Sequence, residues 1–291
     1  METKSQIKEK IGDLVRDKKT QLPTLPIIVD KILNAAREEG TSSKDLSDFI
    51  CNDQALTNKL LRLSNSAYYG QMKEVDSIQR AITVVGFNEI IGLTIGMSVF
   101  STFKENPVQE VFDIQDLWLH SVGCATAAKE ICMKIGVKEG EKLFLNGLLH
   151  DMGKVIFAVY FPEEYRAVLE HAKTDKTFLG YKEKQMLGID HAALTGVLMK
   201  KWNFPDSLVF PSRFHHEPID CPLEYRNHAM IVGLADFLCH QVGIGNSGNP
   251  APKVQRTLLQ ELKISEKELK GLLQVLRDKR SSIQEFFHLM K

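Results

Sequence analysis

The segment LLHDMGK contains the adjacent residues His150 and Asp151, and further histidines and aspartates lie in apolar stretches on either side of it. The other members of this set are His120, His191, His215, His216 and Asp236. Imidazoles and carboxylates without thiolates are suitable ligands for iron, manganese, zinc or cobalt. Asp236 stands in the apolar segment MIVGLADFLC, where an ionised carboxylate is costly unless it is paired, hydrogen-bonded or bound to a metal. The set therefore predicts ligands for two divalent metal ions.

The spacing of these residues indicates which of them can act together. Residues four apart share one face of a helix, so Asp116 should project with His120. Asp236 and His240 have the same spacing, and either pair could hold a cation. In a continuous helix His150 and Asp151 would be about 100° apart, so both reach one ion only near the helix edge. A carboxylate at Asp151 could bridge two ions.

Each candidate also has an ordinary structural interpretation. A buried histidine such as His120 is more often a hydrogen-bonded core residue than a ligand, and Asp116 fits an exposed position on its helix. His215 and His216 could form a polar helix end, and His240 could support a ligand rather than be one. Lys154 could be a solvated residue at a helix end. The set as a whole favours the metal site over these separate interpretations.

The segments that carry these residues have helical patterning nearly throughout. Helices are predicted over 4–17, over 27–39 with a stop at Gly40, and after caps at Ser42 or Ser43 and at Asp53. The next helix is predicted to break at Gly86 and to restart at Asn88. Further helices are predicted over 108–136 and 141–161, near 177, 190, 205 and 223, and at the C-terminus over 257–280 and 282–290. Strand signals are sparse, so the predicted fold class is all-α.

Small residues and loop residues add detail to this pattern. Gly92 and Gly96 are four apart, which would let another helix approach closely. The stretch QVGIGNSGNPAPK is the clearest loop. The predicted organisation is an N-terminal helical lobe of residues 1–105, a metal-site lobe of residues 106–245, and C-terminal helices over 246–291. The lobes are expected to share an interface.

Composition limits the classes of partner. Lys plus Arg number 37 and Asp plus Glu number 37, so no global field attracts nucleic acid or a membrane surface. No apolar stretch reaches the roughly 18 residues that a membrane span needs, and the N-terminus is not signal-like, so a cytoplasmic location is expected. The five cysteines form no C-x-x-C pair, which argues against disulfides and against a thiolate zinc site and favours buried thiols.

The ordered set of a histidine, an HD pair, further histidines and a distal aspartate resembles the signature of the HD superfamily of metal-dependent phosphohydrolases. The blocks LPTLPIIVDKIL, DQALTNKLLRLSNSAYYG and SIQRAITVVGFNEI resemble those of its HDOD branch, and the resemblance covers residues 20–240. It implies a multi-helix HD-type domain with an N-terminal helical lobe. HDOD proteins as a group resemble degenerate HD domains linked to bacterial signalling.

A catalytic branch, the HD-GYP phosphodiesterases, extends the resemblance to single residues. It implies that one metal is held by His120, His150, Asp151 and Asp236. Asp151 would bridge to a second metal, whose other ligands would be His191, His215 and His216. Asp116 would occupy the place of an extra acidic ligand, and Lys154 would contact a substrate phosphate. Two divalent ions are implied, iron or manganese rather than zinc.

The chain departs from that branch after HHE, where HHEPIDCPLEY lacks the Gly-Tyr-Pro loop. Two functions therefore stay open. The first is a regulatory protein with a retained di-metal site, which acts as a signalling or protein-interaction module and has signalling proteins as partners. The second is a metal-dependent phosphohydrolase, a phosphodiesterase or nucleotide phosphatase that acts on a phosphate-containing small molecule. Its metal-bridged hydroxide would attack phosphorus in line, with Asp151 and Lys154 as catalytic residues. The regulatory function is favoured.

Overall fold

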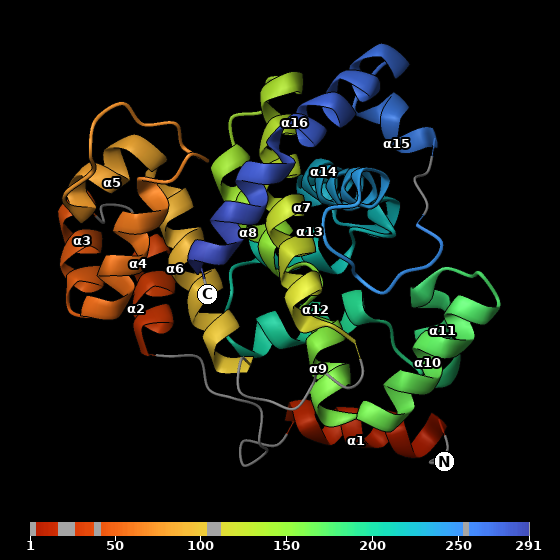
Figure 1. The fold of residues 1–291 in the computed structure, drawn as a ribbon. Helices are drawn as coiled ribbons and strands as arrows, with labels where there is room; N and C mark the ends of the chain where they lie inside the picture. The colour runs from red at the N-terminus through yellow and green to blue at the C-terminus, as the bar shows by residue number, and fades with distance from the viewer. Residues whose placement is uncertain (1–3, 17–26, 38–41, 104–111, 253–255, 291) are drawn as a thin grey trace.

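The structure is a computed structural model, and it describes residues 4–16, 27–37, 42–103, 112–252 and 256–290 (Figure 1). Within these ranges the chain forms helices and no strand, which confirms the all-α prediction. The helices are α1 (Lys4–Arg16), α2 (Ile27–Arg37), α3 (Ser43–Cys51), α4 (Gln54–Ser64), α5 (Ile78–Val85), α6 (Phe87–Phe103), α7 (Ile114–Ile135), α8 (Gly140–Leu149), α9 (Met152–Tyr160), α10 (Pro162–Thr174), α11 (Leu179–Met186), α12 (His191–Lys201), α13 (Asp206–Arg213), the short 3-10 helix η2 (Pro218–Asp220), α14 (Leu223–Val242), α15 (Arg256–Glu261) and α16 (Glu266–Met290).

The predicted caps at Ser42 and Asp53 and the break at Gly86 are confirmed, α6 begins at Phe87 rather than at the predicted Asn88, and the predicted stop at Gly40 lies outside the described residues. Ser42 forms a capping box, in which its side chain accepts from the backbone N–H of Asp45 and the Asp45 carboxylate accepts from that of Ser42. Asp53 caps α4 by accepting from the N–H of Leu56 at 3.0 Å. Gly86 has a φ of 112°, a left-handed value that favours glycine, and it separates α5 from α6.

Helix α6 lies between the N-terminal helices and the rest of the molecule. It contacts α2, α4 and α5 on one side and α8 on the other, and nearly all of its side chains are buried. The predicted close approach at its small residues is confirmed, because a Cβ at Gly92 would lie 3.4 Å from the Cβ of Leu145. A Cβ at Gly96 would lie 2.1 Å from Cδ2 of Leu148. The two glycines therefore let α8 pack directly on α6.

Helix α1 lies apart from the other helices of the predicted 1–105 lobe. It contacts α12, and in Figure 1 it lies beside α9 and α10, away from α2 to α5. Its buried residues Ile7 and Ile11 are four apart and share one face, as expected of an amphipathic helix. Its apolar face thus covers part of the metal-site lobe.

Helices α7 and α8 form the centre of the molecule, with α14 and α16 packed against α7. Helix α7 begins at Ile114, because Asp113 caps it by accepting from the N–H of Gln115 at 2.8 Å. The prediction started this helix at Val108, and residues 104–111 lie outside the described part of the chain. The helix ends where Gly136 takes a left-handed φ of 75°.

The single helix predicted over 141–161 is wrong, because the chain divides there into α8 and α9. The hydroxyl of Thr195 on α12 accepts from the N–H of Gly153 at 2.8 Å and donates to the carbonyl of His150 at 3.1 Å. In a continuous helix each of these two backbone groups would pair within the helix, the N–H of Gly153 with the carbonyl of Leu149 and the carbonyl of His150 with the N–H of Lys154. Their pairing with α12 instead sets His150 and Asp151 at the junction of two helices.

The C-terminal helices cover one side of α7 and α14. The helices predicted over 257–280 and 282–290 are wrong in their break, because the chain divides between α15 and α16 at residues 262–265 and α16 then runs unbroken from Glu266 to Met290. Helix α16 contacts α4, α7 and α14. Lys279 on α16 forms an ion pair with Glu130 on α7 at 2.6 Å. Of the predicted loop, residues 243–252 lie after α14, residues 241 and 242 are the end of α14, and residue 253 lies outside the described part of the chain.

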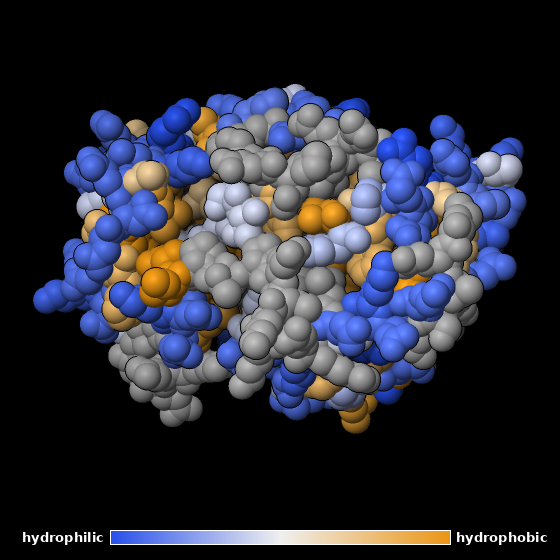
Figure 2. All heavy atoms as spheres, turned by 90° about the horizontal axis from the view of Figure 1, so that it is seen from below, coloured by the Kyte–Doolittle hydropathy of each residue, from blue (hydrophilic) through white to orange (hydrophobic). Residues whose placement is uncertain are grey.

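No single described helix has both the length and the apolar character needed to cross a membrane, and α5 and α6 reach them only as a pair bent by 112°. Figure 2 shows one face of the molecule, on which hydrophilic side chains surround separate hydrophobic patches.

Candidate metal centre

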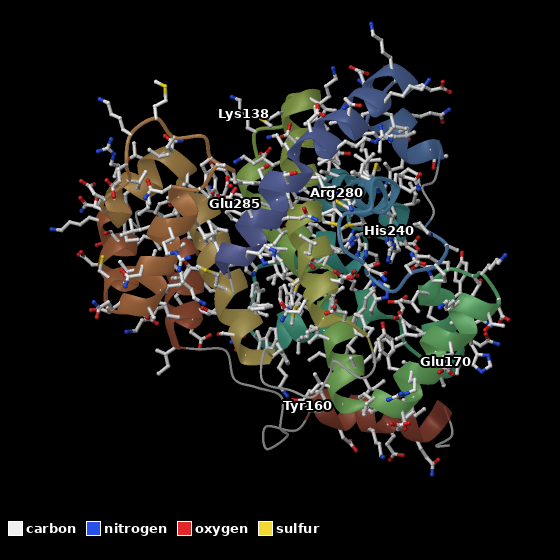
Figure 3. All side chains as sticks on the ribbon, in the orientation of Figure 1. Lys138, Tyr160, Glu170, His240, Arg280 and Glu285 are labelled. Carbon is white, nitrogen blue, oxygen red and sulfur yellow. The ribbon has the colours of Figure 1, made fainter. Side chains whose placement is uncertain are left out.

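One part of the centre is built where α7 packs against α14. His120 of α7 is fully buried, and its Nε2 lies 2.9 Å from Oδ1 of Asp236 on α14. His240 follows Asp236 by one turn, and its Nε2 lies 3.4 Å from the same Oδ1. The hydroxyl of Ser247 lies 3.0 Å from Nε2 of His240, and Figure 3 shows His240 beside the loop after α14. The buried Asp236 carboxylate is thus surrounded by imidazoles.

The junction of α8 and α9 supplies the middle of the centre. The Nδ1–H of His150 donates to the carbonyl of Gly147 at 2.8 Å, which leaves its Nε2 directed to the carboxylates. That Nε2 lies 3.4 Å from Oδ2 of Asp151 and 3.8 Å from Oδ1 of Asp236. Lys154 is buried and donates to Oδ2 of Asp151 at 2.7 Å. Oδ1 of Asp151 has no hydrogen-bond partner in the described part of the chain.

Three further histidines close the other side. His191 begins α12, and its Nδ1 lies 2.5 Å from Oε2 of the buried Glu183, which orients its ring. Its Nε2 therefore points to Oδ1 of Asp151 at 3.3 Å and to Nε2 of His216 at 2.9 Å. His215 follows α13 and donates from Nδ1 to the carbonyl of Ser212 at 2.7 Å, so its Nε2 is also turned inward.

These residues fit divalent metal ions. Three groups have ligand atoms within 4.8 Å of one another: His120 with Cys124, His150 and Asp236; His150 with Asp151 and His215; and His191 with His215 and His216. In the described residues, the buried Nε2 atoms of His150 and His215 have no hydrogen-bond partner, and neither has Oδ1 of Asp151. Buried polar atoms without partners are costly, and metal ions would satisfy all three.

The protonation states also suit metal binding. Burial lowers the pKa of His120 to about 4 and that of His215 to about 3, so both imidazoles are neutral near pH 7. Burial opposes the protonation of His150 too, but the neighbouring carboxylates outweigh it and raise this pKa to about 10. Burial raises the pKa of Asp151, yet His150 and Lys154 together hold it well below its ordinary value. A metal ion near His150 would replace its proton.

The structure brings together seven of the eight residues predicted as metal ligands. These are His120, His150, Asp151, His191, His215, His216 and Asp236, from α7, α14, the α8–α9 junction, the start of α12 and the end of α13. Asp116 is not in these groups: its side chain is exposed, and its backbone carbonyl accepts from the N–H of Asn246 at 3.0 Å. Lys154 lies in the centre, where it pairs with Asp151.

Two residues of the centre were missed in the sequence. Cys124 lies one turn after His120, and the His-x-x-x-Cys spacing on a helix was an available signal that a search for C-x-x-C overlooks. Glu183 orients His191, and its sequence context gives no sign of burial. Four of the five cysteines are buried as predicted, whereas Cys51 is exposed at the end of α3.

The fold and this cluster define an all-α protein with a histidine and aspartate centre of the HD type. The family model of the HDOD domain matches residues 22–218, well over half of the sequence, and the chain belongs to the HDOD family. It is 25% identical over 271 residues to an uncharacterized protein of Treponema pallidum. That alignment covers 92% of this chain and 51% of the other, so the chain spans about half the length of this curated relative.

Solved structures share the fold. An HDOD domain protein of unknown function from Geobacter sulfurreducens is 24% identical with a TM-score of 0.76, over 98% of this chain and 96% of that one. A protein from Shewanella amazonensis, provisionally assigned as a phosphohydrolase, is 23% identical with a TM-score of 0.74, over 97% and 98% of the two chains. A provisionally assigned signal transduction protein from Marinobacter aquaeolei is 18% identical with a TM-score of 0.80, over 99% and 66%.

Proposed function

We propose that this chain is a metal-binding regulatory HDOD protein, in which two divalent ions hold the helices that interact with signalling partners. The observation that carries this proposal is the enclosure of the centre. Its histidines and aspartates are buried except for the half-buried His216 and His240. The pocket that His216 lines has a volume of about 40 Å³. Ligand pockets usually have roughly 300–1,000 Å³, so this pocket beside the centre is too small for a nucleotide.

The position of Lys154 supports the same function. The resemblance implies that this lysine contacts a substrate phosphate, but its ammonium group is buried and lies 2.7 Å from the Asp151 carboxylate. A buried ion pair is expensive to break, because each partner would be left as an uncompensated charge. Lys154 therefore acts as a fixed counter-charge to Asp151 in this conformation. The enclosed centre and this ion pair both favour a structural or sensory metal.

The experiment that tests the proposal is elemental analysis of the purified chain. Near two metal ions per chain are expected, and Asp151→Ala should lower this number, because Asp151 belongs to a ligand group with His150 and His215. Asp116→Ala is the matched control, since its exposed carboxylate lies outside the ligand groups and metal content should not change. Absence of metal from the wild-type chain after supply of iron, manganese and zinc would overturn the proposal.

A second candidate, the phosphohydrolase, is favoured by the charges beside His216. The small pocket is lined by Lys184, Arg213 and His216, and also by Asp190 and Glu217, whose carboxylates both pair with Lys184. The guanidinium of Arg213 lies 5.0 Å from the ring of Phe214, and no hydrogen bond or ion pair of this group is found in the described residues. Arginine and lysine bind phosphate oxygens well. Here His191, His215 and His216 would hold one ion, and bound ions would supply Lewis-acid activation of water.

This candidate is tested by a turnover screen. Phosphodiesters and phosphomonoesters would be supplied to the chain loaded with manganese or iron, and Arg213→Gln would be compared with the wild type. Turnover that Asp151→Ala abolishes and Arg213→Gln weakens would favour the enzyme. Absence of turnover from the metal-loaded chain would leave the regulatory function.

A further inference from the structure

Cys124 lies against the first ligand group of the centre. It follows His120 by one turn of α7, so both side chains share one face of the helix. Its Sγ lies 3.3 Å from Nε2 of His120, and the side chain is fully buried. The sulfur belongs to a group with His120, His150 and Asp236, in which all ligand atoms lie within 4.8 Å of one another. One member, Nε2 of His150, is buried and has no hydrogen-bond partner in the described residues.

The spacing of these four atoms suits a single tetrahedral ion. Metal–nitrogen bonds of about 2.0 Å and metal–sulfur bonds of about 2.3 Å place neighbouring ligand atoms of a site with one sulfur roughly 3.3–3.5 Å apart. Nε2 of His120 lies 3.3 Å from Sγ of Cys124 and 2.9 Å from Oδ1 of Asp236. The same oxygen lies 3.8 Å from Nε2 of His150. The other three pairs of the group lie within 4.8 Å, so side-chain shifts of up to about 1 Å would complete the coordination.

We infer that Cys124 is a thiolate ligand of one of the two metal ions, together with His120, His150 and Asp236, and that this position takes zinc. The inference rests on the proposed metal binding and goes beyond it. A soft thiolate with imidazoles selects zinc over manganese, which prefers oxygen ligands. The four protein ligands close this position, as in structural zinc sites. The other ion, beside His191, His215 and His216, would have no sulfur ligand and a more open site.

The chemistry of the step is a proton exchange. In the metal-free chain, burial and the neighbouring Cys239 raise the pKa of the Cys124 thiol well above its ordinary value, so sulfur carries a proton. When the divalent ion binds, the S–H bond breaks, the sulfur–metal bond forms and the proton passes to solvent. No oxidant or reductant is needed. The competing structural role is a neutral thiol that pairs with Cys239 in the core.

Cobalt substitution of the full chain tests this inference. The metal-free chain would be titrated with Co²⁺, whose thiolate complexes show a sulfur-to-cobalt charge-transfer band in the near ultraviolet. Cys124→Ser should lose this band. Cys239→Ser is the matched control, because it replaces the buried cysteine that contacts Cys124 but is not in the ligand group, and it should keep the band. Bound cobalt is counted separately by elemental analysis.

The outcomes separate this inference from the proposed function. Cobalt bound by the wild-type chain without the band would overturn the thiolate ligand and leave metal binding intact. No bound cobalt or zinc would overturn both. A band that Cys239→Ser abolishes and Cys124→Ser keeps would also overturn it. X-ray absorption of the zinc-loaded wild type needs no variant, and a sulfur neighbour at about 2.3 Å from zinc is expected.

Discussion

At the scale of single residues, the centre depends on side chains that orient its ligands. Glu183 accepts from both Nδ1–H and the backbone N–H of His191, at 2.5 and 2.8 Å, and its other oxygen accepts from the hydroxyl of Tyr165 at 3.1 Å. A carboxylate that holds a ligand histidine fixes the ring and raises its basicity. The acidic partner is therefore part of the metal centre although it touches no ion.

Glu183→Gln should weaken metal binding by roughly 10–100-fold, because the amide no longer carries the charge that orients His191 and makes it basic. Competition with a chromophoric chelator measures this change. Glu217→Gln is the control, since Glu217 is exposed and pairs with Lys184 outside the ligand groups. Equal affinities of the two variants would show that Glu183 is only a packing residue.

A second buried carboxylate should make stability depend on pH. Burial raises the pKa of Glu89, although the ion pair with Lys129 and the hydrogen bond from Tyr69 lower it in part. Because the folded-state pKa of Glu89 lies above its ordinary value of 4.5, protonation of Glu89 favours the folded state. This contribution to the free energy of unfolding is fully present below pH 4.5 and is lost as the pH rises through the folded-state pKa. Across this acid range the wild type should lose unfolding free energy relative to Glu89→Gln. Urea unfolding at several pH values measures it, and parallel pH profiles would contradict it.

At the scale of elements, we expect substitution by alanine to have opposite effects on stability at two glycines. A Cβ at Gly153 in α9 would lie 2.1 Å from the carbonyl oxygen of His191, a backbone atom that cannot turn aside. Gly153→Ala should therefore destabilise the chain by roughly 1–3 kcal/mol and reduce its metal content. Gly271 in α16 has open space around it, so Gly271→Ala should stabilise by about 0.5–1 kcal/mol. Urea unfolding compares the two, and similar shifts would contradict the packing of α9 on α12.

Helix ends could be predicted where a nearby residue defines them. The junction of α8 and α9 could not. Ser42, Asp53 and Gly86 act on backbone groups within a few residues, so the ends they define could be predicted from the sequence. The break between α8 and α9 depends on Thr195, which lies 42 residues after Gly153. Helical periodicity contains no information about such a partner.

The same distinction between local and long-range signals explains which residues of the candidate site could be predicted. Histidines and aspartates in apolar segments must find partners, so their convergence could be predicted from residue type alone. Asp116 shares a turn of α7 with His120, but the orientation of the helix leaves it at the surface. Which side of a helix faces the interior depends on the packed neighbours, here α14 and the loop that follows it.

At the scale of the whole molecule, the ligands come from segments as distant in sequence as His120 and Asp236. An ion that binds the folded chain but not the unfolded chain stabilises the fold by about 2.7 kcal/mol when its free concentration is 100 times the dissociation constant. Chelation should therefore lower the thermal midpoint by several degrees, and zinc or manganese should restore it. Calorimetry measures the shift, and Asp151→Ala should show a smaller one. A chelator effect of equal size in that variant would contradict ligand-dependent stabilisation.

Helix α8 connects α6 with the candidate metal centre. Near its start the carboxylate of Glu141 accepts from the N–H of Asn88 on α6 at 3.3 Å, and Leu148 contacts α6 at Gly96, while His150 directly follows its last turn. A rigid helix cannot move at one end alone. If a partner displaced α6, it would move a metal ligand and change the affinity for the ion. Thermodynamic reciprocity then requires the ion to change the affinity for that partner by the same factor.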